Sequence, residues 1–203
     1  MNALPATHPA KTGVALLLPA TVLVWLTAVV GASLSGALGT LAAAFMPAYA
    51  ALVAVGIATP VVAYFVVPTM RRAVDALGLR RLTLMHVWRI PAALVFFWYG
   101  ALGELPPLFW MLAGTGDLLA GCLAATVWWR PATPDRLRRI HVFGFADFLV
   151  AVGTGLAFTL IGDPRMALLT TLPMVLIPLF GVGLSGASHI VALHTLARPA
   201  ARP

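Results

Sequence analysis

Charged side chains are scarce in this sequence. Only 9% of the 203 residues are Asp, Glu, Lys or Arg, whereas 61% are hydrophobic. A soluble domain of this length carries several times more charge, because charged groups cover most of a surface that faces water. The composition therefore excludes an ordinary soluble domain and predicts an integral membrane protein.

Cysteine and acidic residues are also rare. The single cysteine, Cys122, lies inside an apolar segment, so the chain can form neither an intramolecular disulfide nor a cysteine metal cage. Six acidic residues stand against 13 lysines and arginines, for a formal net charge of +7. The basic residues form short clusters between apolar segments, which predicts contact with a lipid bilayer and not with nucleic acid.

Long apolar segments are what the sequence does contain. A hydrocarbon core about 30 Å thick requires roughly 20 residues of helix. Six segments reach that length: Gly13–Ser35, Phe45–Val67, Leu82–Gly103, Pro107–Trp129, Ile140–Ile161 and Ala167–Leu196. We therefore expect an all-α fold, a polytopic bundle of six transmembrane helices that forms one domain over residues 1–203.

The basic residues between these segments predict the orientation of the chain. They lie in the second and fourth loops and in the two tails: Arg71, Arg72, Arg80, Arg81, Arg130, Arg136, Arg138, Arg139, Lys11, Arg198 and Arg202. The other three loops contain Arg165 alone. Because basic loops stay on the cytoplasmic side, both termini should be cytoplasmic, and we expect a protein of the bacterial cytoplasmic (inner) membrane.

Two aspartates lie within the apolar segments. Asp117 is near the middle of the fourth segment, and a fifth helix that began after Asp147 would be too short to span a bilayer. A charge at the centre of a transmembrane helix costs at least roughly 2.5–3.5 kcal/mol, so both carboxyl groups need a partner or a proton. Arg89 is the expected partner. The alternative is that Arg89 extends to the headgroups and that Pro91 lies in the first turn of a helix that begins late.

One arginine cannot balance two aspartates. Either one carboxyl group is protonated or a histidine supplies the proton. His189 lies at a similar depth in the last segment, with Ser185 one turn before it on the same face, and His86 is three residues before Arg89. His141 and His194 are expected as ordinary residues of the membrane interface.

Three kinds of function are compatible with these residues. The leading hypothesis is a site that binds or translocates a small polar solute, coupled to protons, with Arg89, Asp117, Asp147 and His189 as its central residues. The second is a redox module that holds quinone or haem b, the latter ligated by two of His86, His141 and His189. The third is a structural or accessory subunit without a ligand, in a homo-oligomer or with a partner subunit.

An enzyme is not expected, and no cofactor or metal is required by the leading hypothesis. Ser185 and His189 share one predicted helix, so they can form only a local contact and not a catalytic pair.

The stretch LPPLFWMLAGTGDLLAG, residues 105–121, follows a helix that bears an arginine. This pattern resembles uncharacterised bacterial multi-pass membrane proteins. The resemblance covers the third and fourth predicted helices, and it implies six or so helices and no assigned activity.

Overall fold

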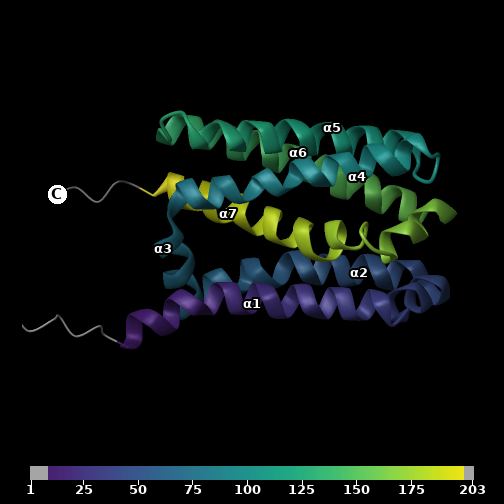
Figure 1. The fold of residues 1–203 in the computed structure, drawn as a ribbon, viewed down its shortest axis with the longest axis horizontal. Helices are drawn as coiled ribbons and strands as arrows, with labels where there is room; N and C mark the ends of the chain where they lie inside the picture. Colours follow the sequence, from purple (N-terminus) through teal and green to yellow (C-terminus); the bar gives the residue numbers. More distant parts are fainter. Residues whose placement is uncertain (1–8, 199–203) are drawn as a thin grey trace, which may run out of the picture.

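Seven α-helices make up most of residues 9–198. The computed structural model describes residues 9–198, within which there is no β-strand, and Figure 1 shows its helices as an elongated bundle. The helices are α1 (Pro9–Leu34), α2 (Ala37–Val66), α3 (Pro68–Leu84), α4 (Arg89–Ala101), α5 (Pro107–Ala125), α6 (Pro134–Leu160) and α7 (Val182–Ala197). The predicted all-α fold is confirmed. Arg202, one of the predicted tail residues, lies outside the described residues.

Within the part of the chain that the structure describes, six helical spans are long and apolar enough to cross a membrane. They are Leu16–Leu34, Ala37–Val66, Pro68–Ala101, Pro107–Trp128, Pro134–Leu160 and Ile177–Ala197. Their number agrees with the six segments predicted from the sequence. Seven helices give six spans because α3 and α4 are joined by a short 3₁₀ turn, η1 (Met85–Trp88), into one span.

The arginine-rich segment from Arg71 to Arg81 differs from the prediction. We expected a loop, whereas the segment belongs to α3. Arginine, leucine and alanine favour the helix, and Gly78 is the residue that interrupts it, with a φ of 74° that L-residues rarely adopt. Arg80 and Arg81 therefore follow a bend at Gly78 within α3.

The last span also begins later than predicted. Its first ten expected residues, 167–176, lie in the 3₁₀ helix η3 (Pro164–Thr170) and in a turn that follows it. This turn contains a cis bond between Leu172 and Pro173. The span then starts with the π-helical turn η4 (Ile177–Gly181), with Pro178 in its first turn. Proline has no N–H and clashes with the preceding turn, so a regular helix cannot continue through these positions.

Successive membrane-length spans alternate in direction along the bundle (Figure 1), and α3 and α4 together form one of them. In Figure 1, α1 begins and α7 ends on the left, and we call this side the terminal end and the opposite side the far end. Helix α4 packs along α5, α5 packs along α6, and α7 contacts both α2 and α6. Helix α7 is consequently an inner helix, and most of its residues from Gly183 to Ala192 are buried.

The largest buried cluster lies in the half of the bundle near the far end. It joins aromatic residues of α2, α4 and α5 to residues that precede α7: Tyr49, Phe96, Phe109, Met166, Leu169, Met174 and Val175. The hydroxyl of Tyr49 donates a hydrogen bond of 2.6 Å to the carbonyl oxygen of Leu169. Large apolar side chains also cover the outer surface, among them Val66 and Ile161, as a bundle that faces lipid requires.

Glycine allows α4 and α5 to approach closely. A Cβ atom at Gly121 would lie 2.7 Å from Cγ1 and 3.0 Å from the backbone N of Ile90. We therefore expect Gly121→Ala to lower the free energy of unfolding in detergent by about 1–3 kcal/mol, the usual cost of an overpacked contact.

Gly153→Ala is the matched control, because a Cβ atom at Gly153 in α6 meets nothing within 4 Å. This variant should be neutral or stabilised by up to about 1 kcal/mol, since alanine favours a helix more than glycine. Thermal and denaturant unfolding of both variants measures the difference. Equal stability of the two variants would contradict the close contact between α4 and α5.

Candidate functional site

The 3₁₀ turn η1 directs two polar side chains into the bundle. Pro91 has no N–H for a regular helical bond, and it is tolerated here because it lies in the first turn of α4. A 3₁₀ helix has three residues per turn, so His86 and Arg89, three residues apart, project to the same side. Both residues are 2% exposed.

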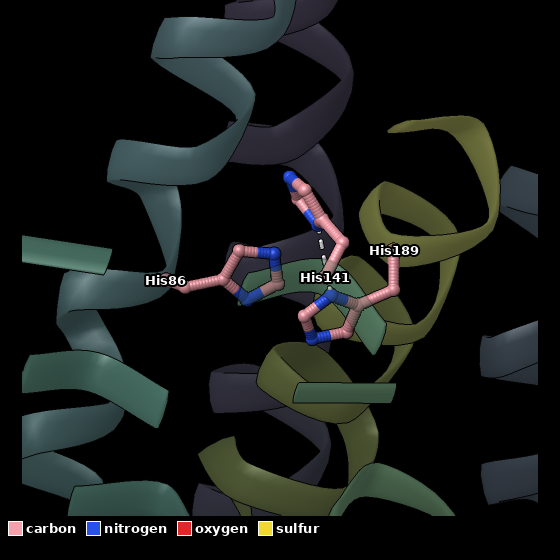
Figure 2. Close-up of side chains that lie close together, drawn as sticks. All are labelled: His86, His141 and His189. Carbon is pink, nitrogen blue, oxygen red and sulfur yellow. Dashed lines mark hydrogen bonds between the residues drawn. The ribbon is translucent and has the colours of Figure 1, made fainter. Parts of the chain in front are cut away.

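Three histidines meet in the interior, as Figure 2 shows. His86 comes from η1, His141 from α6 and His189 from α7, and they are 2%, 0% and 1% exposed. The rings of His86 and His189 stack with centroids 3.9 Å apart and an angle of 17° between their planes. His141 stands edge-on to both, and its Nδ1 is 3.0 Å from Nδ1 of His189.

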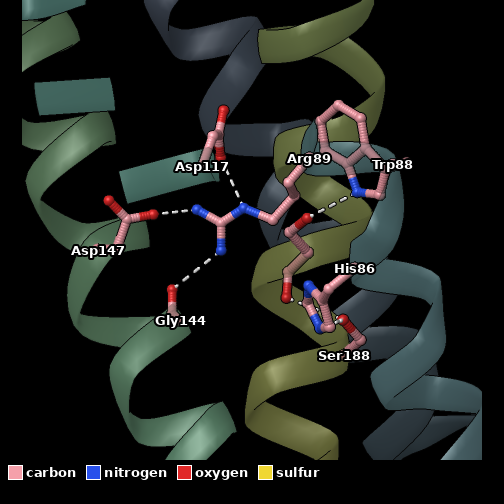
Figure 3. Close-up of polar contacts among 8 residues, drawn as sticks. His86, Trp88, Arg89, Asp117, Gly144, Asp147 and Ser188 are labelled. Carbon is pink, nitrogen blue, oxygen red and sulfur yellow. Dashed lines mark hydrogen bonds and ion pairs between the residues drawn. The ribbon is translucent and has the colours of Figure 1, made fainter. Parts of the chain in front are cut away.

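We call His86, His141 and His189 the histidine cluster. Hydroxyl groups contact the Nε2 atoms of two of its members. Nε2 of His141 is 2.9 Å from Oγ1 of Thr83, and Nε2 of His86 is 2.9 Å from Oγ of Ser188, a contact drawn in Figure 3. Nδ1 of His86 and Nε2 of His189 are fully enclosed and have no hydrogen-bond partner among the described residues. One nitrogen from each of the three rings lies within 4.8 Å of the other two.

The arrangement of these rings differs from that of two histidines that ligate haem b. A haem iron binds two imidazoles on opposite faces of a wide macrocycle. His86 and His189 are instead stacked on each other, with the edge of His141 against both.

A second polar centre lies next to the histidines, and Figure 3 shows it. Nε of Arg89 donates to Oδ1 of Asp117 on α5 at 2.6 Å, Nη2 donates to Oδ2 of Asp147 on α6, and Nη1 donates to the carbonyl oxygen of Gly144 at 3.4 Å. The side chains of the arginine and the two aspartates are 3%, 9% and 8% exposed. We call Arg89, Asp117 and Asp147 the ion centre; its formal charge is −1 when all three groups are ionised.

Two glycines make room for the two centres. A Cβ atom at Gly116 would collide with the carboxyl group of Asp147, and one at Gly144 would collide with the ring of His189. The carbonyl group of Gly144 also accepts the hydrogen bond from Arg89. Gly144 is therefore the residue at which the ion centre and the histidine cluster adjoin.

A cavity of about 340 Å³ borders the ion centre. Arg89 and Asp117 are its charged lining residues, and Trp88 and Ser185 add a polar edge, where the indole N–H donates to the serine oxygen at 3.2 Å. The other walls are largely apolar and come from α2, α4, α5, α6 and the segment before α7: Ala50, Val53, Phe96, Phe109, Phe148, Ala151, Leu156, Leu160, Leu169 and Ile177. The cavity is thus a mostly hydrophobic chamber with one charged wall.

A larger cavity, of about 780 Å³, lies between α1, α2, α3 and α7. Among the described residues no charged side chain lines it, and its polar lining residues are hydroxyl-bearing or indole side chains: Thr21, Thr59, Tyr64, Ser188 and Trp25. None of the three histidines lines either cavity.

The predicted site residues fall into these two groups. Arg89 lies with both aspartates, and its guanidinium is buried between α5 and α6. His189 does not touch the aspartates and contacts His86 and His141 instead. Ser185 accepts its hydrogen bond from Trp88 rather than from His189.

The expectation for His141 was wrong, because this residue is fully buried and not interfacial. Helix α6 begins at Pro134, several residues before the predicted start at Ile140, so His141 lies two turns inside it. The spacing His141, Gly144, Asp147 repeats every three residues and marks one helix face, a signal that could have placed this histidine inside. Thr83 and Ser188, the hydroxyl partners of the histidines, were missed, since their roles depend on contacts between helices.

Arg89 should be energetically coupled to both aspartates. We expect Arg89→Ala to lower the free energy of unfolding by about 3–5 kcal/mol, since it leaves buried carboxylates without their cation. Double-mutant cycles with Asp117→Asn and with Asp147→Asn should each give a coupling energy of about 0.5–3 kcal/mol. Arg89→Lys should also be destabilising, because an ammonium group cannot reproduce three diverging N–H bonds.

The cycle between Arg165 and Asp163 is the control, because this pair lies at the far end with the Arg165 side chain 39% exposed. Its coupling energy should be smaller than either of the two buried ones. Coupling energies of zero in both buried cycles would contradict the ion centre.

Comparison with known proteins gives a family for this chain. No curated protein and no solved structure matches it. The family model described as "Domain of unknown function (DUF8737)" matches residues 46–197, a range that includes the ion centre and all three clustered histidines. The match covers most of the chain, and the protein therefore belongs to the DUF8737 family.

Proposed function

We propose that this protein is a multi-pass protein of the bacterial cytoplasmic membrane with both termini in the cytoplasm. The six apolar spans support a membrane location. Basic residues gather near the terminal end, in α3, in the connection from α5 to α6 and in the first turns of α6. At the far end, Arg165 pairs with Asp163 at 2.6 Å, and the side-chain hydrogen bond from Arg165 lowers the pKa of Asp163 from its ordinary value. Basic residues thus lie mainly near the terminal end, as the positive-inside rule expects of the cytoplasmic side.

Reporter fusions test this orientation. Fusions that end at Ala76 or Thr133 should report a cytoplasmic position, and a fusion that ends at Asp163 should report an external one. A fusion at Thr133 with an external signal would contradict the orientation.

We further propose that the ion centre binds a small cation with an apolar body, in exchange for a proton. The observation that carries this proposal is the lining of the cavity, which combines Asp117 and Arg89 with largely apolar walls. Two carboxyl groups share one guanidinium, so one negative charge is left for a proton or for a cationic ligand. A small polar solute, the ligand expected from the sequence, fits these walls less well than an amphiphilic one does.

Each residue of the ion centre has a separate role in this proposal. Asp117 lines the cavity, and its Oδ1 binds Arg89, whereas no hydrogen bond to its Oδ2 is made within residues 9–198. Asp117 therefore faces the ligand and carries the exchangeable proton. Asp147 and the carbonyl group of Gly144 hold the guanidinium in place, so that Arg89 fixes the position of Asp117.

Ligand-dependent unfolding in detergent tests the proposal. Benzyltrimethylammonium should raise the unfolding temperature of the purified protein, whereas phenylacetate, an anion of similar size, should not. At one hundred times Kd, binding to the folded state adds about 2.7 kcal/mol to stability. Calorimetric titration in two buffers of different ionisation enthalpy should register proton release, and the affinity should fall as the pH is lowered.

Asp117→Asn should fold, because Arg89 and Asp147 remain as a balanced pair, and it should lose the response to benzyltrimethylammonium. Asp163→Asn removes an acidic residue outside the cavity and should keep the response. Stabilisation by phenylacetate, or a response to benzyltrimethylammonium that survives Asp117→Asn, would contradict the proposed function.

A further inference from the structure

We propose that His86, His141 and His189 form a binding site for one first-row transition-metal ion. This site is separate from the cavity and from the cation that we place there, because none of the three histidines lines that cavity. The ligand class is an ion that prefers imidazole nitrogen, such as Zn²⁺ or Cu²⁺.

The spacing of the rings suits a metal ion. A zinc ion lies 2.0–2.1 Å from each histidine nitrogen, so the nitrogens of a tetrahedral site are about 3.4 Å apart. One nitrogen from each ring already lies within 4.8 Å of the others, and the closest pair, Nδ1 of His141 and Nδ1 of His189, is 3.0 Å apart. The stacked rings of His86 and His189 must rotate about their side-chain bonds for both lone pairs to reach one ion.

The hydroxyl groups orient the lone pairs of two histidines toward the centre of the cluster. Thr83 donates its hydroxyl proton to the carbonyl oxygen of Leu79 at 2.8 Å, so its oxygen accepts the Nε2–H of His141. Ser188 donates to the carbonyl oxygen of Ser185 at 3.0 Å, so its oxygen accepts the Nε2–H of His86.

In both rings the proton is therefore on Nε2 and the lone pair is on Nδ1; the lone pair of His86 is unpartnered, and that of His141 faces Nδ1 of His189. Metal-binding histidines have this same arrangement, with one nitrogen on the metal and the other donating to a neighbouring acceptor that fixes the tautomer.

The unpartnered nitrogens point to the same conclusion. Nδ1 of His86 and Nε2 of His189 are enclosed by protein and make no hydrogen bond among the described residues. Buried polar atoms in folded proteins almost always have a partner, and each exception calls for an explanation. A metal ion accounts for Nδ1 of His86, because it takes the lone pair of that nitrogen, and the neutral ring of His189 has one lone pair to offer as well.

The composition of the site selects the class of metal. Three imidazoles without a thiolate or a carboxylate in the set suit zinc, copper, nickel and iron, whereas calcium and magnesium prefer oxygen ligands. The positive charge of the ion is partly balanced by the ion centre, which carries an excess carboxylate and adjoins His189 through Gly144. Three protein ligands leave at least one coordination position for water or another small ligand.

Metal titration of the full-length protein tests the proposal. The wild type is purified in detergent, stripped with a chelator, and titrated with Zn²⁺ against a chromophoric competitor. We expect one tightly bound Zn²⁺ per chain, and the loss of this binding in His86→Gln, His141→Gln and His189→Gln. Thr83→Val and Ser188→Ala should bind Zn²⁺ about 10–100-fold more weakly, since these residues orient the ligands.

His194→Gln is the matched control, because His194 is also on α7 but contacts Tyr64, Phe65 and Arg198 and not the histidine cluster. It should bind Zn²⁺ as the wild type does. Asp117→Asn should still bind one Zn²⁺ per chain, more weakly because the excess carboxylate is lost, and this separates the site from the cation site.

Electron paramagnetic resonance of Cu²⁺ bound to the wild type needs no variant, and it should resolve hyperfine coupling to imidazole nitrogens. Absence of Zn²⁺ and Cu²⁺ binding, copper coupled to oxygen ligands alone, or Zn²⁺ binding that survives all three glutamine variants would overturn the proposal.

Discussion

The guanidinium group of Arg89 connects the helices around which this bundle is built. It belongs to the start of α4, and it donates to Asp117 on α5 and to Asp147 and Gly144 on α6. A buried cation is tolerated only where its donors are satisfied, so the three helices must keep their register for Arg89 to be buried at all. The late start of α4 at η1, the proline at position 91 and the missing side chains at Gly116 and Gly144 all serve this arrangement.

The ion centre and the histidine cluster are neighbours because the same short turn supplies both. His86 and Arg89 project from one 3₁₀ turn, and Gly144 accepts a hydrogen bond from Arg89 at a position where a Cβ atom would collide with the ring of His189. Charge at one centre therefore acts on the other through a few ångströms of protein, where electrostatic interactions are stronger than in water. A cation at Asp117 and a metal ion at the histidines would each reduce the affinity for the other.

The sequence predicted the parts of this structure that depend on composition and on helical spacing. Six apolar spans followed from length and hydropathy, and Arg89 could be paired with the aspartates because two buried carboxyl groups need a cation. Contacts between helices could not be predicted. His141 was placed at the interface because the start of α6 at Pro134 was missed, and the stacking of His86 on His189 depends on how η1 packs against α7. The hydroxyl partners Thr83 and Ser188 follow from the same packing, which no periodicity in one helix reveals.

We propose that the ion centre holds one exchangeable positive charge against its excess carboxylate. Infrared difference spectroscopy of the protein with ¹³C-labelled aspartate measures this directly, because a protonated carboxyl group absorbs separately from a carboxylate. We expect the wild type to show the signal of one protonated aspartate at neutral pH and Asp117→Asn to lack it. Binding of benzyltrimethylammonium to the wild type should abolish this signal. No protonated aspartate at neutral pH, or a signal that benzyltrimethylammonium leaves unchanged, would contradict it.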